Sequence, residues 1–269
     1  MKLGLCTAPE NTALAAELGF DYVECGLSAL AALTEEEYQS LLSQKPSFAV
    51  PITHCNGFLP GTVKTTGPDV SQAQQREYLQ TAFSRASALG VGTVVYGSGA
   101  SRGVPEGWSH VEAWKQIIDF LKLAAEYAEK YGITIAIEPL RRKECNIVNL
   151  VSEATLLAAA VHHPRVGALG DTFHMRSSYE PYQALTYAGE ALRHVHISHT
   201  LPDMSRRIFP AEGDGEDYQA IFAALLEGGY DARVSVEGGC DNFAEDAPKA
   251  YHALTEARAA AEVAFAARG

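Results

Sequence analysis

Three carboxylates and one imidazole lie at or near the ends of short apolar segments that are typical of buried β-strands. Glu138 ends the segment ITIAIE, Asp171 ends VGALGD, Glu237 ends RVSVE, and His196 lies near the end of RHVHIS. In a barrel of parallel strands, the carboxyl ends of the strands meet at one mouth. Carboxylates gathered there would repel one another unless a cation lay between them. The four residues together therefore predict a metal site, although any one of them alone is equally well explained as a salt-bridged or hydrogen-bonded residue.

Apolar, β-branched segments alternate with helical patterns along the whole chain. Such alternation is typical of parallel strands joined by right-handed crossovers, and eight strands favour a closed barrel over an open sheet. We therefore predict an α/β fold, a (β/α)8 TIM barrel, as one domain over residues 1–269. The predicted strands are residues 2–6, 21–25, 48–54, 92–98, 133–138, 166–171, 194–198 and 233–237. The predicted helices are residues 10–19, 34–42, 69–90, 110–131, 152–161, 182–189, 217–228 and 242–269, with Ser152 as a helix cap.

Length and composition agree with this fold and disfavour several classes of function. A barrel of this kind takes about 250 residues, and this chain has 269, of which 47% are apolar. The formal net charge of −12 disfavours binding to nucleic acid or to anionic membranes. The chain has five cysteines and no CxxC pair, which disfavours a disulfide framework or a zinc ribbon. The N-terminal segment lacks a signal-peptide pattern, so we expect a cytoplasmic protein.

Residues 133–239 carry four motifs that resemble a known family. IEPLRRKE, GDTFH, HVHIS and SVEGG are similar to strand-end motifs of the D-tagatose 3-epimerase and D-psicose 3-epimerase family of sugar isomerases and epimerases, within the xylose-isomerase-like barrels. The resemblance implies a divalent metal, most often Mn²⁺ with Mg²⁺ or Co²⁺ as alternatives, bound by Glu138, Asp171, His196 and Glu237. It also implies that the two glutamates move a proton at C3 of a sugar through an enediolate.

The same resemblance implies substrate contacts from Glu144 and from His174, which would hydrogen-bond the substrate carbonyl. One position departs from the family, because Pro202 stands where those epimerases have an arginine. Arg206 or Arg207, in the following loop, could take that role. Arg141 is a further departure, and it could bind an anionic group or remain solvated.

Three other aromatic residues have open interpretations. His54 ends a predicted strand and could reach the substrate pocket or a second metal. Trp108 follows another strand and could stack on a sugar or cover the barrel rim. His194 precedes His196 by two residues, so both lie on the same side of the strand and His194 lies deeper in the barrel. We therefore expect His194 to be a hydrogen-bonded core residue.

The chemistry of the predicted site is intelligible from the residues themselves. A divalent cation that binds the oxygens beside a carbon stabilises the enediolate that forms when this carbon loses its proton. One carboxylate can remove the proton, and a second carboxylate on the opposite face can return it with inverted configuration. Glu138 and Glu237 come from separate strands, as this requires. The leading prediction is therefore a metal-dependent sugar epimerase or isomerase that acts on a small-molecule sugar.

Three alternatives stay open at this point. The same apparatus in a lyase could eliminate a group from a 3-keto-glycoside or an inosose. A phosphodiesterase of the endonuclease IV type would need a histidine-rich metal cluster and a basic face, which the net charge disfavours. The third is a catalytically silent partner subunit, against which the two intact glutamates argue. Barrels of this kind often pair, so a dimer or tetramer is expected.

Overall fold

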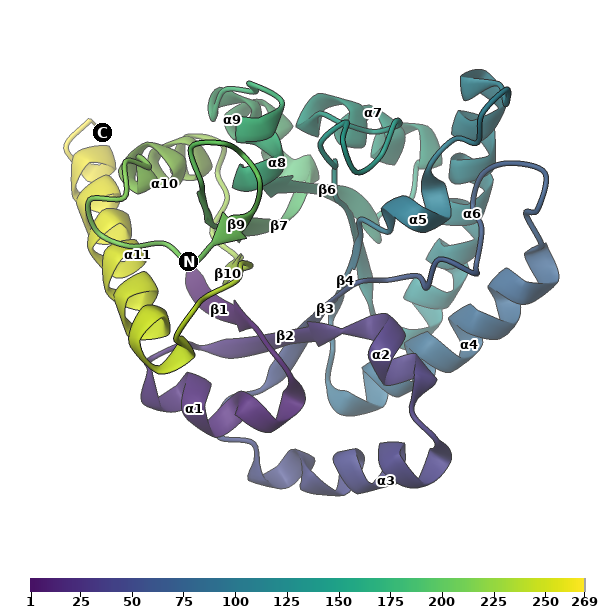
Figure 1. Cartoon of the computed structure of the whole chain (residues 1–269), viewed down its shortest axis with the longest axis horizontal. Helices are drawn as coiled ribbons and strands as arrows, with labels where there is room; N and C mark the ends of the chain where they lie inside the picture. Colours follow the sequence, from purple (N-terminus) through teal and green to yellow (C-terminus); the bar gives the residue numbers. More distant parts are fainter. Residues whose placement is uncertain (269) are drawn as a thin grey trace.

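The computed structural model describes residues 1–268 and has the predicted barrel. Its eight barrel strands are β1 (Lys2–Cys6), β2 (Tyr22–Gly26), β3 (Ile52–Asn56), β4 (Thr93–Tyr96), β5 (Thr134–Ile137), β6 (Val166–Asp171), β7 (Leu192–Ile197) and β10 (Arg233–Val236). They close in the order β1-β10-β7-β6-β5-β4-β3-β2, and every neighbouring pair is parallel. Figure 1 shows the ring of strands with the helices around it. The prediction of a (β/α)8 TIM barrel is confirmed.

Helices follow the strands and form the outer layer of the barrel. They are α1 (Thr12–Glu17), α2 (Leu27–Ala32), α3 (Glu35–Gln44), α4 (Gln72–Leu89), α5 (Gly99–Arg102), α6 (His110–Tyr131), α7 (Val151–Val161), α8 (Thr172–Ser177), α9 (Gln183–Ala188), α10 (Tyr218–Glu227) and α11 (Phe243–Ala266). Three short 3-10 helices are η1 (Pro9–Asn11), η2 (Lys45–Ser47) and η3 (Gly189–Ala191). Within residues 1–268, none of the helices has both the length and the apolar character that a bilayer span requires.

The longest internal crossover helix, α6, shows why the sequence pattern located the helices well. Ser109 caps it by accepting a hydrogen bond from the Glu112 amide, which satisfies one of the unpaired N–H groups of the first turn. The helix ends at Gly132, whose φ of 69° is left-handed and suits glycine. Between these ends an apolar stripe that includes Ile117, Leu121 and Ala128 is buried. Predicted and observed bounds coincide for this helix.

The barrel interior is partly apolar and partly polar. Val95, Ala136 and Leu169, from three neighbouring strands, form a small apolar cluster. The alternate residues of the same strands, such as Ile135 and Ile137 of β5, belong to the main core shared with the helices. The other half of the interior holds buried polar side chains, namely Glu24, His54, His194 and Ser235. These polar residues lie directly beneath the candidate site.

The structure differs from the prediction in several details, among them the short helices α2, α5 and α8, which were not predicted. The third strand begins at Ile52 rather than at residue 48, because Pro51 has no N–H for the ladder. Ser152 lies within the first turn of α7 rather than at its cap, and the Val151 amide donates to the Glu180 carboxylate. The loop after β7 contains an unpredicted antiparallel hairpin of β8 (His199–Thr200) and β9 (Arg207–Ile208).

Candidate metal centre and active site

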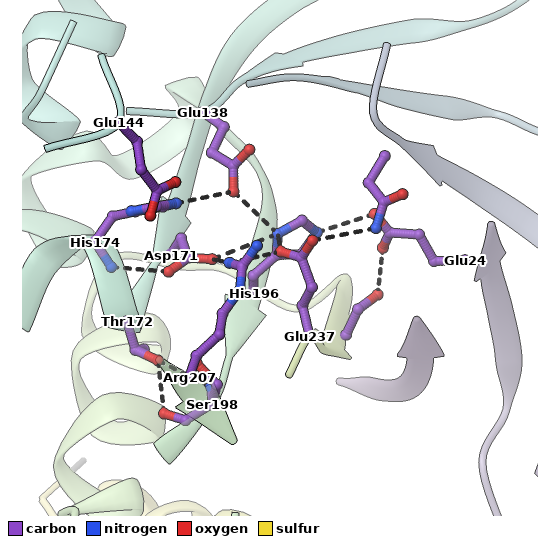
Figure 2. A network of polar contacts seen from close by, with 12 residues as sticks. Glu24, Glu138, Glu144, Asp171, Thr172, His174, His196, Ser198, Arg207 and Glu237 are labelled. Atoms are coloured by element: carbon purple, nitrogen blue, oxygen red, sulfur yellow. Dashed lines mark hydrogen bonds and ion pairs between the residues drawn. The ribbon is translucent and has the colours of Figure 1, made fainter. Parts of the chain in front are cut away.

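The four residues at the ends of neighbouring strands come together at the mouth of the barrel. Asp171 is the last residue of β6, His196 lies in β7, and Glu138 and Glu237 directly follow β5 and β10. One ligand atom from each residue lies within 4.8 Å of those of the other three. Figure 2 shows their side chains pointing at one another. The arrangement is the one that the sequence predicts for a metal site.

The Nδ1 atom of His196 faces all three carboxylates. It lies 2.7 Å from Glu237 Oε2, 3.3 Å from Glu138 Oε1 and 3.6 Å from Asp171 Oδ2. The imidazole is almost completely buried, with an exposed fraction of 1%. Nδ1 is therefore the ring atom available to a cation held by these carboxylates.

Arg207, from the unpredicted hairpin, reaches into the same group. Its Nη1 atom lies 2.7 Å from Asp171 Oδ2 and 2.9 Å from Glu237 Oε2, as Figure 2 shows. Its guanidinium also lies over the ring of Phe173, 5.7 Å from the centroid. The hairpin β8–β9 thus places a positive charge against two of the carboxylates.

The charges in this buried group shift one another's pKa values. Burial raises the pKa of Asp171, but His174, Arg207 and His196 together outweigh this effect and leave the pKa lowered. Burial likewise opposes ionisation of Glu237, and the charges of His196 and Arg207 lower its pKa. Burial lowers the pKa of His196, but Glu237 and Glu24 outweigh it and raise the pKa well above the ordinary value. A proton on His196 therefore supplies charge that a divalent cation can replace.

Two buried polar atoms in the site lack a hydrogen-bond partner within the described part of the chain. One is Glu237 Oε2, whose close approaches to His196 and Arg207 do not have hydrogen-bond geometry. The other is His174 Nε2. Nδ1 of His174 accepts the backbone N–H of Arg141 at 3.1 Å, so the ring proton is on Nε2. Nε2 lies 3.9 Å from Glu138 Oε1 and is a donor that points into the site without an acceptor.

Small and polar neighbours hold the two glutamates in place. A Cβ atom added at Gly97, just after β4, would lie 2.1 Å from Glu138 Oε2, so the glycine leaves room for that carboxylate. Asn56, the last residue of β3, donates from Nδ2 to Glu237 Oε1 at 3.3 Å. Gly97 thus lies directly against the carboxylate of Glu138.

Two further predicted residues lie beside the centre. His174 is in α8 with its backbone N–H bonded to Asp171 Oδ1. Glu144 is half-exposed, and its Oε1 accepts from Arg141 Nε at 2.6 Å. Nη1 of Arg141 donates to the carbonyl of Met204 at 2.6 Å. The guanidinium therefore stabilises the loop after β7 and is already paired within the protein. Figure 2 shows Glu144 and His174 next to Glu138.

Three predicted residues lie elsewhere. Arg206 is more than half exposed and pairs with Asp241. His54 is buried, and its ring contacts those of Tyr22 and His194 with centroid separations of 5.0 and 4.3 Å. It therefore lies beneath the site and not in its mouth. Trp108 is half-buried, and its indole N–H donates to Gln116 on α6 at 3.2 Å, which matches the interpretation as a rim residue.

Glu24 is the residue of this region that sequence reasoning did not place in the site. It is fully buried in β2, and its carboxylate contacts both His196 and His194. It is the second-to-last residue of the segment DYVEC, close to a strand end as Glu138 is in ITIAIE, and this was the available signal. Cys6, Glu24 and His196 also form a second group of close ligand atoms. Burial raises the pKa of the Cys6 thiol well above the ordinary value, which disfavours the thiolate that a metal requires.

A cavity of about 900 Å³ opens beside the centre. Glu24, Asn56 and Glu237 line its inner end, and its walls extend to η1 and to the inner face of α3. Glu10, Glu36 and Glu37 line its outer part, and among residues 1–268 the lining includes no lysine or arginine. The volume is near the upper limit of the roughly 300–1,000 Å³ of ligand sites, so a monosaccharide fits with room to spare.

Comparison with known proteins gives consistent results for the fold. Residues 12–264 match the model of the family described as xylose isomerase-like TIM barrel. A ketose 3-epimerase of Arthrobacter globiformis is 31% identical over 114 residues, which are 42% of this chain and 37% of that protein. The curated relatives are thus matched over about half of their length or less.

Two solved structures resemble the whole chain. A D-psicose 3-epimerase in the presence of D-fructose has a TM-score of 0.83 at 19% identity and covers 97% of this chain and 99% of that one. The IOLI protein with a binding zinc atom has a TM-score of 0.70 at 21% identity, with coverage of 97% and 98%. At these identities the structures establish a shared fold.

Proposed function

Because the chain belongs to the xylose isomerase-like TIM barrel family, we propose that it is a divalent-metal-dependent isomerase that epimerises a ketose or keto-sugar. The observation that carries the proposal is the juxtaposition of the four-residue ligand group with the unpartnered Nε2 donor of His174. The relatives at partial coverage include epimerases of ketoses and of a 3-dehydro-guloside, and an inosose isomerase. These activities share the loss of a proton from a carbon beside a carbonyl.

The donor set supports a bound divalent cation. Glu138, Asp171 and Glu237 would supply carboxylate oxygens and His196 would supply Nδ1, a combination that suits Mn²⁺, Mg²⁺, Co²⁺ or Zn²⁺. The buried and unpartnered Glu237 Oε2 is the kind of atom that a cation satisfies. When bound, such a cation would stabilise negative charge on the substrate oxygens beside the reacting carbon. We propose Mn²⁺ as the resident ion, and the zinc-bound IOLI neighbour supports a metal in this fold.

The protein's own groups would move the proton. The two glutamates follow β5 and β10, which are separated in the barrel by β6 and β7. Their carboxylates therefore approach the centre from different sides, as Figure 2 shows. One can remove the proton at C3 while the other holds a proton for the opposite face. His174 Nε2–H would donate to the substrate oxygen that gains charge.

The cavity supports an unphosphorylated substrate. Its lining carries several carboxylates and no lysine or arginine among the described residues, so a phosphate there would be repelled. Arg207 lies outside this lining, and it is already paired with Asp171 and Glu237. We therefore propose a neutral sugar, which can carry a further uncharged or cationic group.

We expect Arg207→Ala to lower kcat/KM for the preferred sugar by about 10- to 100-fold. Removing the guanidinium takes away charge-assisted contacts to Glu237 and Asp171 and leaves Glu237 less well oriented. Steady-state kinetics at saturating metal would measure the loss. Arg206→Ala is the matched control, because Arg206 pairs with Asp241 at the surface and its removal should change kcat/KM little. Equal effects of the two substitutions would contradict this role of Arg207.

The proposed function is tested by following deuterium from heavy water into sugars by NMR. The metal-loaded protein is incubated with a panel of neutral ketoses, 3-keto-glycosides, inososes and phosphorylated ketoses. We expect deuterium at C3 of a neutral ketose or keto-sugar, together with its C3 epimer. Release of the glycosidic group or of water would indicate a lyase instead. No exchange with any sugar would favour a silent binding subunit, and cleavage of abasic DNA would favour a phosphodiesterase.

A homo-oligomer remains a prediction.

A further inference from the structure

Glu24 forms a buried network directly behind the candidate metal ligand His196. Its Oε1 atom lies 2.9 Å from His196 Nε2, and its Oε2 atom lies 2.8 Å from His194 Nε2. Ser235 donates its hydroxyl to Oε2 at 2.6 Å. Glu24, His194 and Ser235 all have an exposed fraction of 0%. The carboxylate is thus isolated from solvent, and three polar side chains lie within hydrogen-bond distance of it.

We propose that Glu24 is a positioning residue that fixes the tautomer and orientation of His196 for the cation. This inference rests on the metal site of the proposed function. Glu24 accepts the N–H of His196 Nε2, so in a neutral ring the lone pair is on Nδ1. Nδ1 is the atom that faces Glu138, Asp171 and Glu237. The hydrogen bond thus directs Nδ1 towards the ligand group. The negative charge of Glu24 also makes Nδ1 more basic and so a stronger metal ligand.

The position of Glu24 is itself defined by packing. The hydroxyl of Tyr22 and that of Ser235 are 2.9 Å apart. The Tyr22 ring lies where a Cβ of Gly4 would be, 2.1 Å from that position, so Gly4 makes room for the ring. Nδ1 of His194 donates to the Arg233 carbonyl at 3.1 Å. These contacts come from β1, β2, β7 and β10 and restrict the carboxylate to one arrangement.

Burial of an ionised carboxylate is costly unless it is fully hydrogen-bonded. A purely structural core position could be filled by an apolar side chain at less cost. The contact to His196 explains why a carboxylate occupies this position, which packing alone does not explain.

Three variants separate the positioning role from a structural role. Glu24→Leu removes the acceptor for His196. Glu24→Gln keeps an oxygen acceptor for His196 while its amide can donate to His194. Tyr22→Phe removes a hydrogen bond of the same buried network that reaches neither Glu24 nor His196. Thermal unfolding of the metal-free proteins reports how much each substitution disturbs the fold.

Zn²⁺ affinity, measured by isothermal titration calorimetry, is the first readout. We expect Glu24→Leu to weaken binding about 10- to 100-fold, Glu24→Gln to weaken it less, and the Tyr22→Phe control to leave it nearly unchanged. Equal binding by the wild type and Glu24→Leu would overturn the inference. So would a loss in Tyr22→Phe as large as that in Glu24→Leu, because the effect would then be structural. No binding by the wild type would instead refute the proposed metal site.

The second readout is made on the wild-type protein, and one variant serves only to assign its signals. In the Zn²⁺-loaded protein with ¹⁵N-labelled histidine, the His196 signals are identified by their absence from His196→Gln. We expect a proton on Nε2, shifted downfield by its hydrogen bond to a carboxylate, and no proton on Nδ1. A proton on Nδ1, or Zn²⁺ bound through Nε2, would overturn the inference whatever the activity of the protein.

Discussion

Replacement of Glu138 or Glu237 by glutamine is expected to slow epimerisation about a thousand-fold. Each substitution keeps the size of the side chain and one oxygen atom for the metal, but it removes the group that accepts or returns a proton. The two carboxylates lie in the same ligand group, with oxygens 3.3 and 2.7 Å from His196 Nδ1. Steady-state rates with the preferred sugar and its epimer, at metal concentrations that saturate each variant, would measure the effect.

The two variants should differ in how they exchange protons with solvent. If one carboxylate serves each face of the sugar, each variant retains the base for one epimer only. Glu138→Gln should then incorporate deuterium into one epimer, and Glu237→Gln into the other, although neither interconverts the pair quickly. Exchange confined to the same epimer in both variants would indicate a single base that serves both faces.

Glu10→Gln is a suitable control for these experiments. Glu10 is an exposed residue that lines the outer part of the same cavity, so its substitution removes a negative charge without touching the ligand group. We expect near-wild-type turnover for this variant. Wild-type turnover in Glu138→Gln or Glu237→Gln at saturating metal would show that the carboxylate concerned does not transfer the proton.

The fold and the gathering of Glu138, Asp171, His196 and Glu237 could be predicted from the sequence because both depend on local patterns. Each barrel strand is a short apolar run, and the carboxyl ends of parallel strands all lie on the side of the mouth. Asp171 and Glu237 could therefore be located to the residue without knowledge of their neighbours. The choice of His196 over His194 followed from the same rule, and His194 is a buried residue bonded to Glu24 and to the Arg233 carbonyl.

The contacts of the loop after β7 could not be predicted. Arg206 and Arg207 are adjacent and chemically identical, yet one pairs with Asp241 at the surface and the other with Asp171 and Glu237. The hairpin β8–β9 decides between them, because neighbouring residues of an extended segment point to opposite sides. Two-residue strands leave no hydrophobic pattern in the sequence, so this alternation could not be assigned in advance.

The depth of a polar residue in the barrel was equally hard to foresee. His54 and Glu24 both lie near strand ends in the sequence, and in the structure they are register partners on β3 and β2. Both side chains point to the interior, where they meet His194. The stagger between neighbouring strands determines which strand-end residues reach the mouth, and this stagger depends on the whole closed barrel. A local pattern therefore could not distinguish a ligand from a residue beneath it.

Removal of metal is expected to abolish turnover and C3 exchange, and addition of Mn²⁺, Mg²⁺, Co²⁺ or Zn²⁺ should restore them to different extents. Without the cation, a proton on His196 and the guanidinium of Arg207 counter the carboxylates, and neither can stabilise both oxygens of an enediolate. Exhaustive dialysis against a chelator, with metal content checked by elemental analysis, followed by titration with each ion would measure the dependence. Full activity of a preparation free of metal would contradict the proposed chemistry.

Metal binding should also stabilise the fold, independently of catalysis. A ligand present at 100 times its Kd stabilises the native state by about 2.7 kcal/mol, so the midpoint of thermal unfolding should rise when the ion is added. His196→Gln is the control, because it removes the imidazole nitrogen that faces all three carboxylates and should show a much smaller rise. An equal rise in this variant would mean that the ion stabilises the protein from a different site. The enolisation chemistry would then lack its cation, because the oxygens beside the reacting carbon would have no positive charge bound between Glu138 and Glu237.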